Sequence, residues 1–235
     1  TILDNEQLKG LLDCIASQID VSTLEEFTLE SGRPDTITAE KFAIAKAYGV
    51  TRVSVNPQSL CDDVLCGVGR NHTVEQFYRA FEDARRADIK TVNVDLIAGL
   101  PSYPLDMLVA DIAELIKIGV DELQVESLKV LPGTSMRSNA VLKGLKYSPL
   151  PPYEVLMTSS MSAHDLRTAM QISRMLDFYY NNIQITPPFP SFTILPKVLL
   201  IFLSPTLSKV DRILAGEAGR NHKVHLRKAK TDHSV

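Results

Sequence analysis

The chain has 235 residues, a net charge of -3, 45% hydrophobic residues and 23% charged residues, which is the composition of a globular protein long enough to bury one core. The slightly acidic balance provides no basic surface for nucleic acid, and the most apolar run, residues 198–203, is too short to span a membrane. Three cysteines fit a reducing compartment such as the cytoplasm better than a disulfide scaffold.

The first half of the chain alternates predicted helices with short predicted strands. Asp4, Thr38 and Thr73 each look like the N-cap of a helix, and a fourth periodic helix covers residues 105–118. The predicted strands cover residues 25–30, 51–56, 91–98 and 122–129. Connections of helical length between strands favour parallel pairing, with all carboxyl ends of the strands at one edge of the sheet. We therefore predict an α/β fold that forms part of a (β/α) barrel.

The second half of the chain has a different character. Residues 147–152 contain three prolines and are predicted to form a rigid linker, followed by a helical segment over residues 153–181 with Ser162 as an internal cap. The sequence then becomes proline-rich and, after about Ser208, basic and polar, so a frayed tail is expected. This suggests three regions: a partial barrel (1–137), a linker with a helical extension (138–182) and a poorly defined tail (183–235).

Polar residues stand where otherwise apolar strands end. Glu30 and Gln58 follow the first two strands, Asp95 interrupts the third, and Lys129 ends the fourth. The carboxyl-terminal edge of such a sheet is where α/β barrels build small-molecule sites. Each residue also has a structural interpretation, with Glu30 as a solvated carboxylate and Asp95 as a cap for a neighbouring loop.

Other polar residues are more ambiguous. Arg70 could form a surface ion pair with Asp62 or Asp63, and His72 could simply begin a helix. The pair His222 and His225 has a spacing that a metal could use, although a basic tail is the preferred explanation. We expect no metal ligands in this chain and leave the catalytic residues open.

Four motifs carry a family resemblance: Phe27-Thr-Leu-Glu-Ser-Gly-Arg-Pro34, Val53-Ser-Val-Asn-Pro-Gln-Ser59, Gly69-Arg-Asn-His72 and Val94-Asp-Leu-Ile-Ala-Gly-Leu-Pro101. In their order and spacing, over about residues 3–137, the chain resembles radical S-adenosylmethionine (SAM) enzymes of the oxygen-independent coproporphyrinogen III oxidase (coproporphyrinogen dehydrogenase) type. The resemblance implies a radical SAM barrel, which would be truncated at its N-terminal side here.

The resemblance also implies the residues that contact SAM, namely Glu30, Gln58, Arg70 and Asp95. The chemistry is consistent with this assignment, because SAM carries a sulfonium, an ammonium, a carboxylate and a ribose diol. Carboxylates suit the cationic and hydroxyl groups, and the planar guanidinium of an arginine suits the carboxylate.

Enzymes of this type hold a [4Fe-4S] cluster on a Cys-x-x-x-Cys-x-x-Cys loop, and the chain contains no such triplet among Cys14, Cys61 and Cys66. In the family, a Gly-Gly-Gly-Thr-Pro turn precedes a stretch similar to the first residues of this chain. We therefore expect the sequence to start just after that turn, without the cluster loop and the first two barrel strands, and to be inactive by itself. A sheet without those strands would expose an edge, so association is also expected.

For the parent protein, the resemblance implies oxidative decarboxylation of coproporphyrinogen III to protoporphyrinogen IX in porphyrin biosynthesis, with SAM, a [4Fe-4S] cluster and an electron donor. The alternatives are a non-catalytic haem-binding or haem-delivery protein, another radical SAM activity, or a decayed gene fragment. A barrel enzyme acting on a phosphorylated metabolite is disfavoured, because no glycine-rich phosphate loop follows the last strand.

Overall fold

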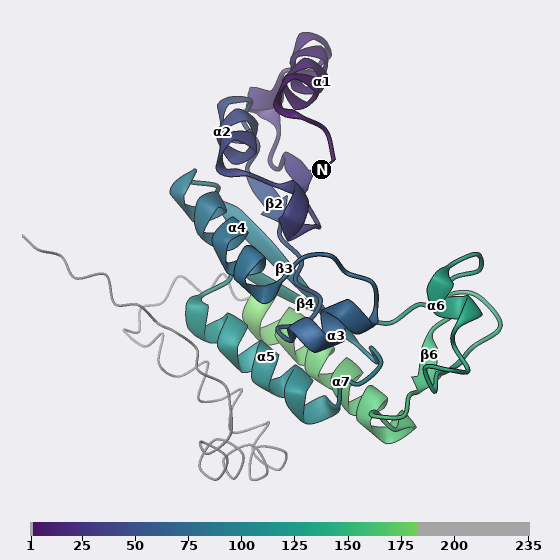
Figure 1. Cartoon of the computed structure of the whole chain (residues 1–235). Helices are drawn as coiled ribbons and strands as arrows, with labels where there is room; N and C mark the ends of the chain where they lie inside the picture. Colours follow the sequence, from purple (N-terminus) through teal and green to yellow (C-terminus); the bar gives the residue numbers. More distant parts are fainter. Residues whose placement is uncertain (1, 183–235) are drawn as a thin grey trace, which may run out of the picture.

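The computed structural model describes residues 2–182, so the predicted tail and the pair His222 and His225 lie outside the described residues. Its centre is a parallel sheet with the strand order β1-β2-β3-β4 (Figure 1). The strands are β1 (Thr28–Glu30), β2 (Arg52–Ser54), β3 (Thr91–Ala98) and β4 (Glu122–Ser127). The predicted α/β class and parallel pairing are confirmed, although β1, β2 and β4 are shorter than predicted.

Five helices alternate with these strands: α1 (Asn5–Gln18), α2 (Ala39–Ala47), α3 (Asp62–Gly67), α4 (Val74–Arg86) and α5 (Leu105–Ile118). Single 3-10 turns occupy Val21–Thr23 and Pro34–Thr36. The predicted caps are confirmed, since Asp4 and Thr73 each form a capping box and the side chain of Thr38 accepts from the backbone N–H of Lys41. Gly119 ends α5 in the left-handed conformation, with φ 75°.

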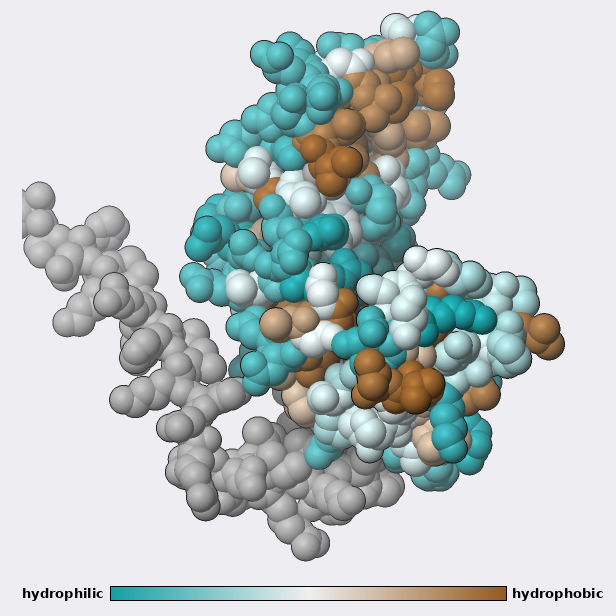
Figure 2. Space-filling view, turned by 45° about the vertical axis from the view of Figure 1, so that its right-hand side comes forward, coloured by the Kyte–Doolittle hydropathy of each residue, from teal (hydrophilic) through white to brown (hydrophobic). Residues whose placement is uncertain are grey.

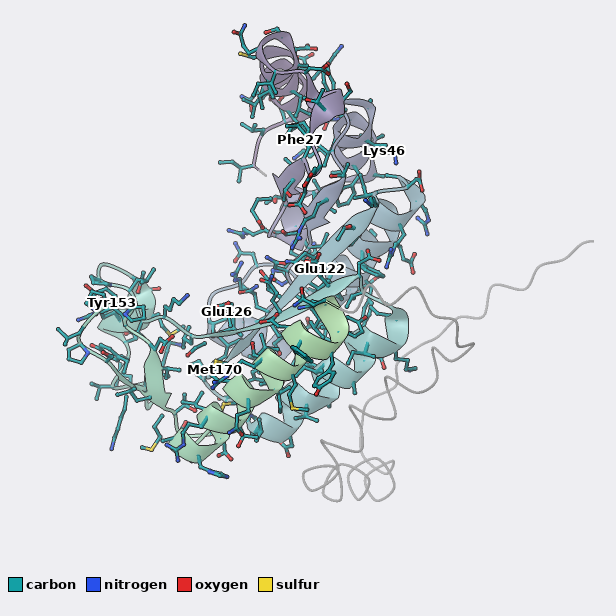
Figure 3. The ribbon with its side chains drawn as sticks, turned by 180° about the vertical axis from the view of Figure 1, so that it is seen from behind. Phe27, Lys46, Glu122, Glu126, Tyr153 and Met170 are labelled. Carbon is teal, nitrogen blue, oxygen red and sulfur yellow. The ribbon has the colours of Figure 1, made fainter. Side chains whose placement is uncertain are left out.

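The two faces of the sheet differ in chemistry because neighbouring strand residues point to opposite sides. One face is apolar and is packed under α4 and α5, which lie in front of the sheet in Figure 1; its residues are Val53, Val55, Val92, Val94, Leu96, Ala98, Leu123 and Val125. The other face, which we call the polar face, is turned away from α4 and α5 and toward the viewer in Figure 3. Its residues are Glu30, Ser54, Asn56, Asn93 and Asp95.

The segment after β4 corrects two predictions. The predicted rigid linker over residues 147–152 is instead part of a hairpin, because β5 (Lys146–Tyr147) pairs antiparallel with β6 (Val155–Met157) and the residues between them form the connection. The predicted helix over residues 153–181 is also wrong at its start, since α7 begins only at Ala163 and runs to Leu176. The backbone N–H of Val155 donates to Leu128 O at 2.8 Å, so pairing with the end of β4 holds this segment extended.

A short helix, α6 (Ser135–Ser138), precedes the hairpin and carries an arginine that contacts two aromatic rings of the hairpin. The guanidinium of Arg137 lies 5.0 Å from the ring centre of Tyr147 and 5.3 Å from that of Tyr153. Figure 1 shows α6 and β6 projecting together to one side of the sheet.

The end of α7 covers the outer edge of β4. After α7, a π-helical turn spans Asp177–Asn181, and the side-chain amide of Asn181 both accepts from Leu123 N and donates to Leu123 O, each at 3.0 Å. The hydroxyl of Tyr180 donates to Val120 O. A side-chain amide thus satisfies the backbone groups that a further strand would otherwise bind.

Among residues 2–182, no helix combines the length and the apolar character needed to cross a membrane.

Candidate functional site

The polar face contains a row of side chains at matching positions on three strands. Glu30, Ser54 and Asn93 are register partners on β1, β2 and β3. The hydroxyl of Ser54 donates to Glu30 Oε2 at 3.0 Å, which orients the carboxylate. A Cβ atom added at Gly32 would lie 3.1 Å from Glu30 Oε1, so the glycine leaves room for this carboxylate.

Asp95 lies two residues further along β3 and accepts from two amides. Asn56 Nδ2 donates to Asp95 Oδ2 at 2.7 Å, and Asn93 Nδ2 donates to Asp95 Oδ1 at 2.8 Å. The opposite amide atoms, Asn56 Oδ1 and Asn93 Oδ1, are buried without a hydrogen-bond partner. Asp95 therefore binds its own strand through Asn93 and the segment that follows β2 through Asn56, so the side chain combines a contact with a neighbouring loop and a place on the polar face.

Asp95 is partly buried and lies near two further carboxylates. Burial raises the pKa of the Asp95 carboxyl, and the charges of Glu30 and Glu126 raise this pKa further. The amide of Asn93 and the guanidinium of Arg52 oppose this shift of the pKa. A cationic or hydrogen-bond-donating group would therefore be stabilised beside Asp95.

Arg52 neutralises the amino-terminal end of the same face. It forms ion pairs with Glu26 and with Glu122, which is labelled on β4 in Figure 3. Its Nη1 donates to Glu122 Oε1 at 3.0 Å. Because Arg52 is shared between these two carboxylates, the negative charge of Glu30 and Asp95 at the carboxyl-terminal end is only weakly compensated.

Gln58 and Arg70 form the edge of the site beyond β2. Gln58 has a left-handed backbone, with φ 68°, and pairs with β3 through a hydrogen bond from its N–H to Asp95 O at 3.0 Å. Its Oε1 accepts from Arg70 Nη2 at 3.1 Å. The surface ion pair considered for Arg70 is wrong: Asp62 instead accepts from Val74 N at 2.8 Å.

His72 lies beneath this edge and is 2% exposed. Its Nε2 lies 3.0 Å from Pro57 O, so the ring supports the turn that carries Gln58. Burial lowers the pKa of His72, which favours the neutral ring. Its role is therefore structural, and it does more than begin a helix. The backbone of Lys129 forms an isolated antiparallel β-bridge with Glu154 of the hairpin, and its side chain forms an exposed ion pair with Glu126.

The strand order and the family resemblance predict Glu30, Gln58, Arg70 and Asp95 at one end of the sheet. They do not predict that Ser54, Asn56 and Asn93 belong to the same site. The signal was available, because these three residues interrupt valine-rich strands at alternate positions. A parallel strand buried on both faces would be apolar throughout. Alternating polar residues therefore mark a face that binds something polar.

The two groups that the resemblance implies fit this chain to different degrees. Within residues 2–182 no three potential metal ligands lie together: Cys14 is on α1, whereas Cys61 and Cys66 are at opposite ends of α3. The residues present therefore do not fit a [4Fe-4S] cluster. The acceptors of the polar face and the guanidinium of Arg70 do match the cationic groups and the carboxylate of SAM.

The fold is that of the radical SAM superfamily. Residues 8–116 match the family described as "Radical SAM superfamily", and residues 143–188 match one described as a protein of unknown function (DUF4080). The solved structure of coproporphyrinogen III oxidase (HemN) from Escherichia coli, described as a radical SAM enzyme, superposes with a TM-score of 0.50 at 20% identity, covering 61% of this chain and 38% of that one. Members of this superfamily use SAM and a [4Fe-4S] cluster.

Two curated relatives from Bacillus subtilis give a narrower grouping. The oxygen-independent coproporphyrinogen-III oxidase-like protein HemZ is 35% identical over 127 residues, which cover 54% of this chain and 25% of the relative. The heme chaperone HemW is 36% identical over 174 residues, covering 71% and 45% respectively. Part of the chain is thus similar in sequence to these proteins, and the matches span less than half the length of each.

Proposed function

We propose that this chain is the SAM-binding part of a radical SAM oxidoreductase, and that the whole protein converts coproporphyrinogen III to protoporphyrinogen IX by oxidative decarboxylation. The observation that carries the proposal is the convergence of Glu30, Gln58, Arg70 and Asp95 at the carboxyl-terminal end of three adjacent parallel strands. When bound beside a reduced cluster, SAM supplies a hydrogen-abstracting radical.

Each residue has a distinct part in holding SAM. Glu30, oriented by Ser54, and Asp95, oriented by two amides, would accept from the ammonium and the ribose hydroxyls. Both carboxylates also favour the positive sulfonium. Arg70, fixed through Gln58, would bind the methionyl carboxylate. No cluster ligand is assigned to this chain, so its part of the chemistry is to bind and orient SAM.

The first test is calorimetric titration of the 235-residue chain with SAM and, separately, with S-adenosylhomocysteine, which lacks the sulfonium charge. We expect SAM to bind more tightly, and we expect Glu30→Gln to weaken SAM binding about tenfold, the usual effect of losing one charge-assisted hydrogen bond. Glu114→Gln removes a half-buried charge that pairs with Lys117 on α5, away from the polar face, and is the matched control. Equal affinity for both ligands, or no binding of SAM, would contradict the proposal.

The reaction itself needs a separate test. The coding sequence upstream of Thr1 would be read, and the product that includes any Cys-x-x-x-Cys-x-x-Cys loop would be reconstituted anaerobically with iron and sulfide. Reductive cleavage of SAM together with decarboxylation of coproporphyrinogen III supports the full proposal. SAM cleavage without decarboxylation would indicate another radical SAM activity.

A second candidate function is haem binding or haem delivery. It is favoured by the similarity to the heme chaperone HemW, which extends over 71% of this chain, compared with 54% for the coproporphyrinogen-III oxidase-like relative. A haem titration monitored by absorbance separates the two functions. A tight stoichiometric haem site without decarboxylation would replace the first proposal by the second.

A further inference from the structure

A buried carboxylate that has no part in the proposed SAM contacts lies beneath the site. Asp111, on α5, is 9% exposed, and its Oδ2 accepts three hydrogen bonds. The donors are Leu60 N at 2.8 Å, the Ser59 hydroxyl at 3.3 Å and the Tyr103 hydroxyl at 2.5 Å. These groups belong to the loop after β2 and to the loop between β3 and α5. One oxygen atom therefore joins two loops at the carboxyl-terminal end of the sheet.

The packing of α5 does not require a carboxylate at this position. The neighbouring core residues Leu108, Ile112 and Leu115 are fully buried, and an apolar side chain at position 111 would extend the same surface. Burial instead raises the pKa of Asp111, which means that keeping the charged form in the folded protein is costly. The groups that Asp111 binds therefore account for its presence better than core packing does.

Those groups lie next to a strained residue of the candidate site. Gln58 has φ 68°, a conformation that a residue with a side chain keeps only when its surroundings hold it. On one side, the backbone of Gln58 is fixed to β3, with Gln58 N to Asp95 O and Ile97 N to Gln58 O both at 3.0 Å. On the other side, the two following residues are fixed by Asp111.

The same anchor extends to Arg70. The bound loop leads directly into α3, whose Leu65 N donates to Cys61 O at 3.0 Å. Arg70 N then donates to Leu65 O at 2.9 Å, and the Arg70 side chain returns to Gln58. A displacement of residues 59–61 would therefore move both members of the Gln58–Arg70 pair.

We propose that Asp111 is a positioning residue that holds Gln58 and Arg70 in place for the methionyl carboxylate of SAM. The statement that Asp111 positions residues for SAM rests on the proposed function, whereas the statement that it holds residues 57–72 in place does not. The two can therefore fail independently.

The test compares hydrogen exchange, measured by mass spectrometry on the full chain, in Asp111→Leu, Asp111→Asn and a control, Leu115→Ala, that weakens the same helix away from these loops. We expect Asp111→Leu to accelerate exchange of residues 57–72 about tenfold beyond the change in the rest of the sheet, since a hydrogen bond to a charged acceptor is lost. Asp111→Asn keeps an acceptor oxygen and should restore most of the protection. Leu115→Ala should change exchange throughout the domain without singling out residues 57–72.

The outcomes separate the possibilities. If Asp111→Leu and Leu115→Ala give the same exchange pattern, Asp111 acts only in overall stability and the proposal is overturned. If Asp111→Leu does not fold, Ser59→Ala removes one donor without altering α5 and must still accelerate exchange of residues 57–72. If the wild-type chain binds no SAM, the proposed function fails, while the exchange data still decide whether Asp111 holds the loop.

Discussion

Asp95 is an acidic residue whose ionised form is poorly stabilised by the folded chain. Because its pKa is raised, the folded state binds a proton more tightly than the unfolded state does. Ionised Asp95 therefore lowers the free energy of unfolding at pH values above its folded pKa, and this cost disappears as the pH falls toward the ordinary value of about 3.9. A positively charged ligand would relieve the same cost at neutral pH.

This makes the stability of Asp95→Asn a sharp prediction. We expect the variant to be at least as stable as the wild type at pH 7, because the buried charge is gone. The new amide can donate to the unpartnered oxygen of Asn56 or Asn93 after that side chain rotates. The difference in unfolding free energy should shrink as the pH approaches 4, as measured by urea denaturation. Glu114→Gln is the control, and a variant much less stable than wild type at pH 7 would show that the hydrogen bonds from Asn56 and Asn93 stabilise the ionised carboxylate by more than burial destabilises it.

Arg70 tests whether geometry or charge matters at the edge of the site. Lysine keeps the charge but cannot form the planar pair of parallel hydrogen bonds that a carboxylate prefers. We expect Arg70→Lys to weaken SAM binding about tenfold in the same titration while unfolding free energy changes little. Arg79→Lys, on the exposed surface of α4, is the control. Unchanged affinity in Arg70→Lys would mean that Arg70 contributes only its charge.

At the scale of elements, two glycines with similar backbone conformations allow the cost of backbone strain to be measured separately from the cost of steric crowding. Gly99 and Gly119 have φ 85° and 75°. A Cβ atom at Gly119 would meet nothing within 4 Å, whereas one at Gly99 would lie 2.5 Å from Val155 Cγ1 in β6. Alanine at Gly119 should cost about 1 kcal/mol, the usual price of a left-handed backbone.

Alanine at Gly99 should cost about 1–3 kcal/mol more than at Gly119, because β3, β6 and α7 must move apart. Urea unfolding of both variants measures the difference. Equal losses would show that the hairpin shifts freely, and that its packing against the end of β3 is looser than the structure indicates.

The helices and strands differ in how well the sequence predicts them. The starts of α1, α2, α4 and α5 agree with the predictions to within a residue, because a cap such as Asp4 or Thr73 is a local signal that needs no tertiary contact. The segment over residues 153–161 was assigned to the wrong class, because its extended form depends on hydrogen bonds to Leu128 and Val130 from a distant part of the chain. Three-residue strands such as β1 also lack the length for a clear alternation.

The candidate site shows the same division. Glu30, Gln58, Arg70 and Asp95 could be placed at one end of the sheet from the order of strands and the family resemblance. Asp111 could not, because an acidic residue within an amphipathic helix normally indicates a solvent-exposed position. Its burial follows from the loops that reach it, and these are not visible in the local pattern. The bond between Arg70 and Gln58 likewise depends on how the turn after α3 returns to β2.

For the whole described part of the chain, the two edges of the sheet are unequal. The side chain of Asn181 binds β4 at its outer edge, whereas β1 is the other outer strand in the sheet order. Apolar surface gathers at the same end of the molecule, over the N-terminal helices at the top of Figure 2, where the exposed residues are Ile2, Leu11, Ile19 and Leu24. We therefore predict concentration-dependent association through this end.

Size-exclusion chromatography with light scattering tests this prediction. Thr28→Lys places a charge on the edge strand β1 and should shift the chain toward the monomer. Gln171→Lys adds the same charge to exposed α7 and should leave association unchanged. A wild-type chain that is monomeric at all concentrations would contradict the prediction.

The contrast between the two faces of the sheet has a consequence for how this chain tolerates change. The valine and leucine residues under α4 and α5 contribute buried apolar area to the core, whereas the polar face contributes hydrogen bonds, which stabilise the fold less and can instead bind a ligand. Ligand preference can therefore be altered by substitutions on one side of a strand while the other side keeps the protein folded. Because successive residues of β3 belong alternately to the two faces, one position in the sequence affects mainly stability and the next affects mainly ligand binding.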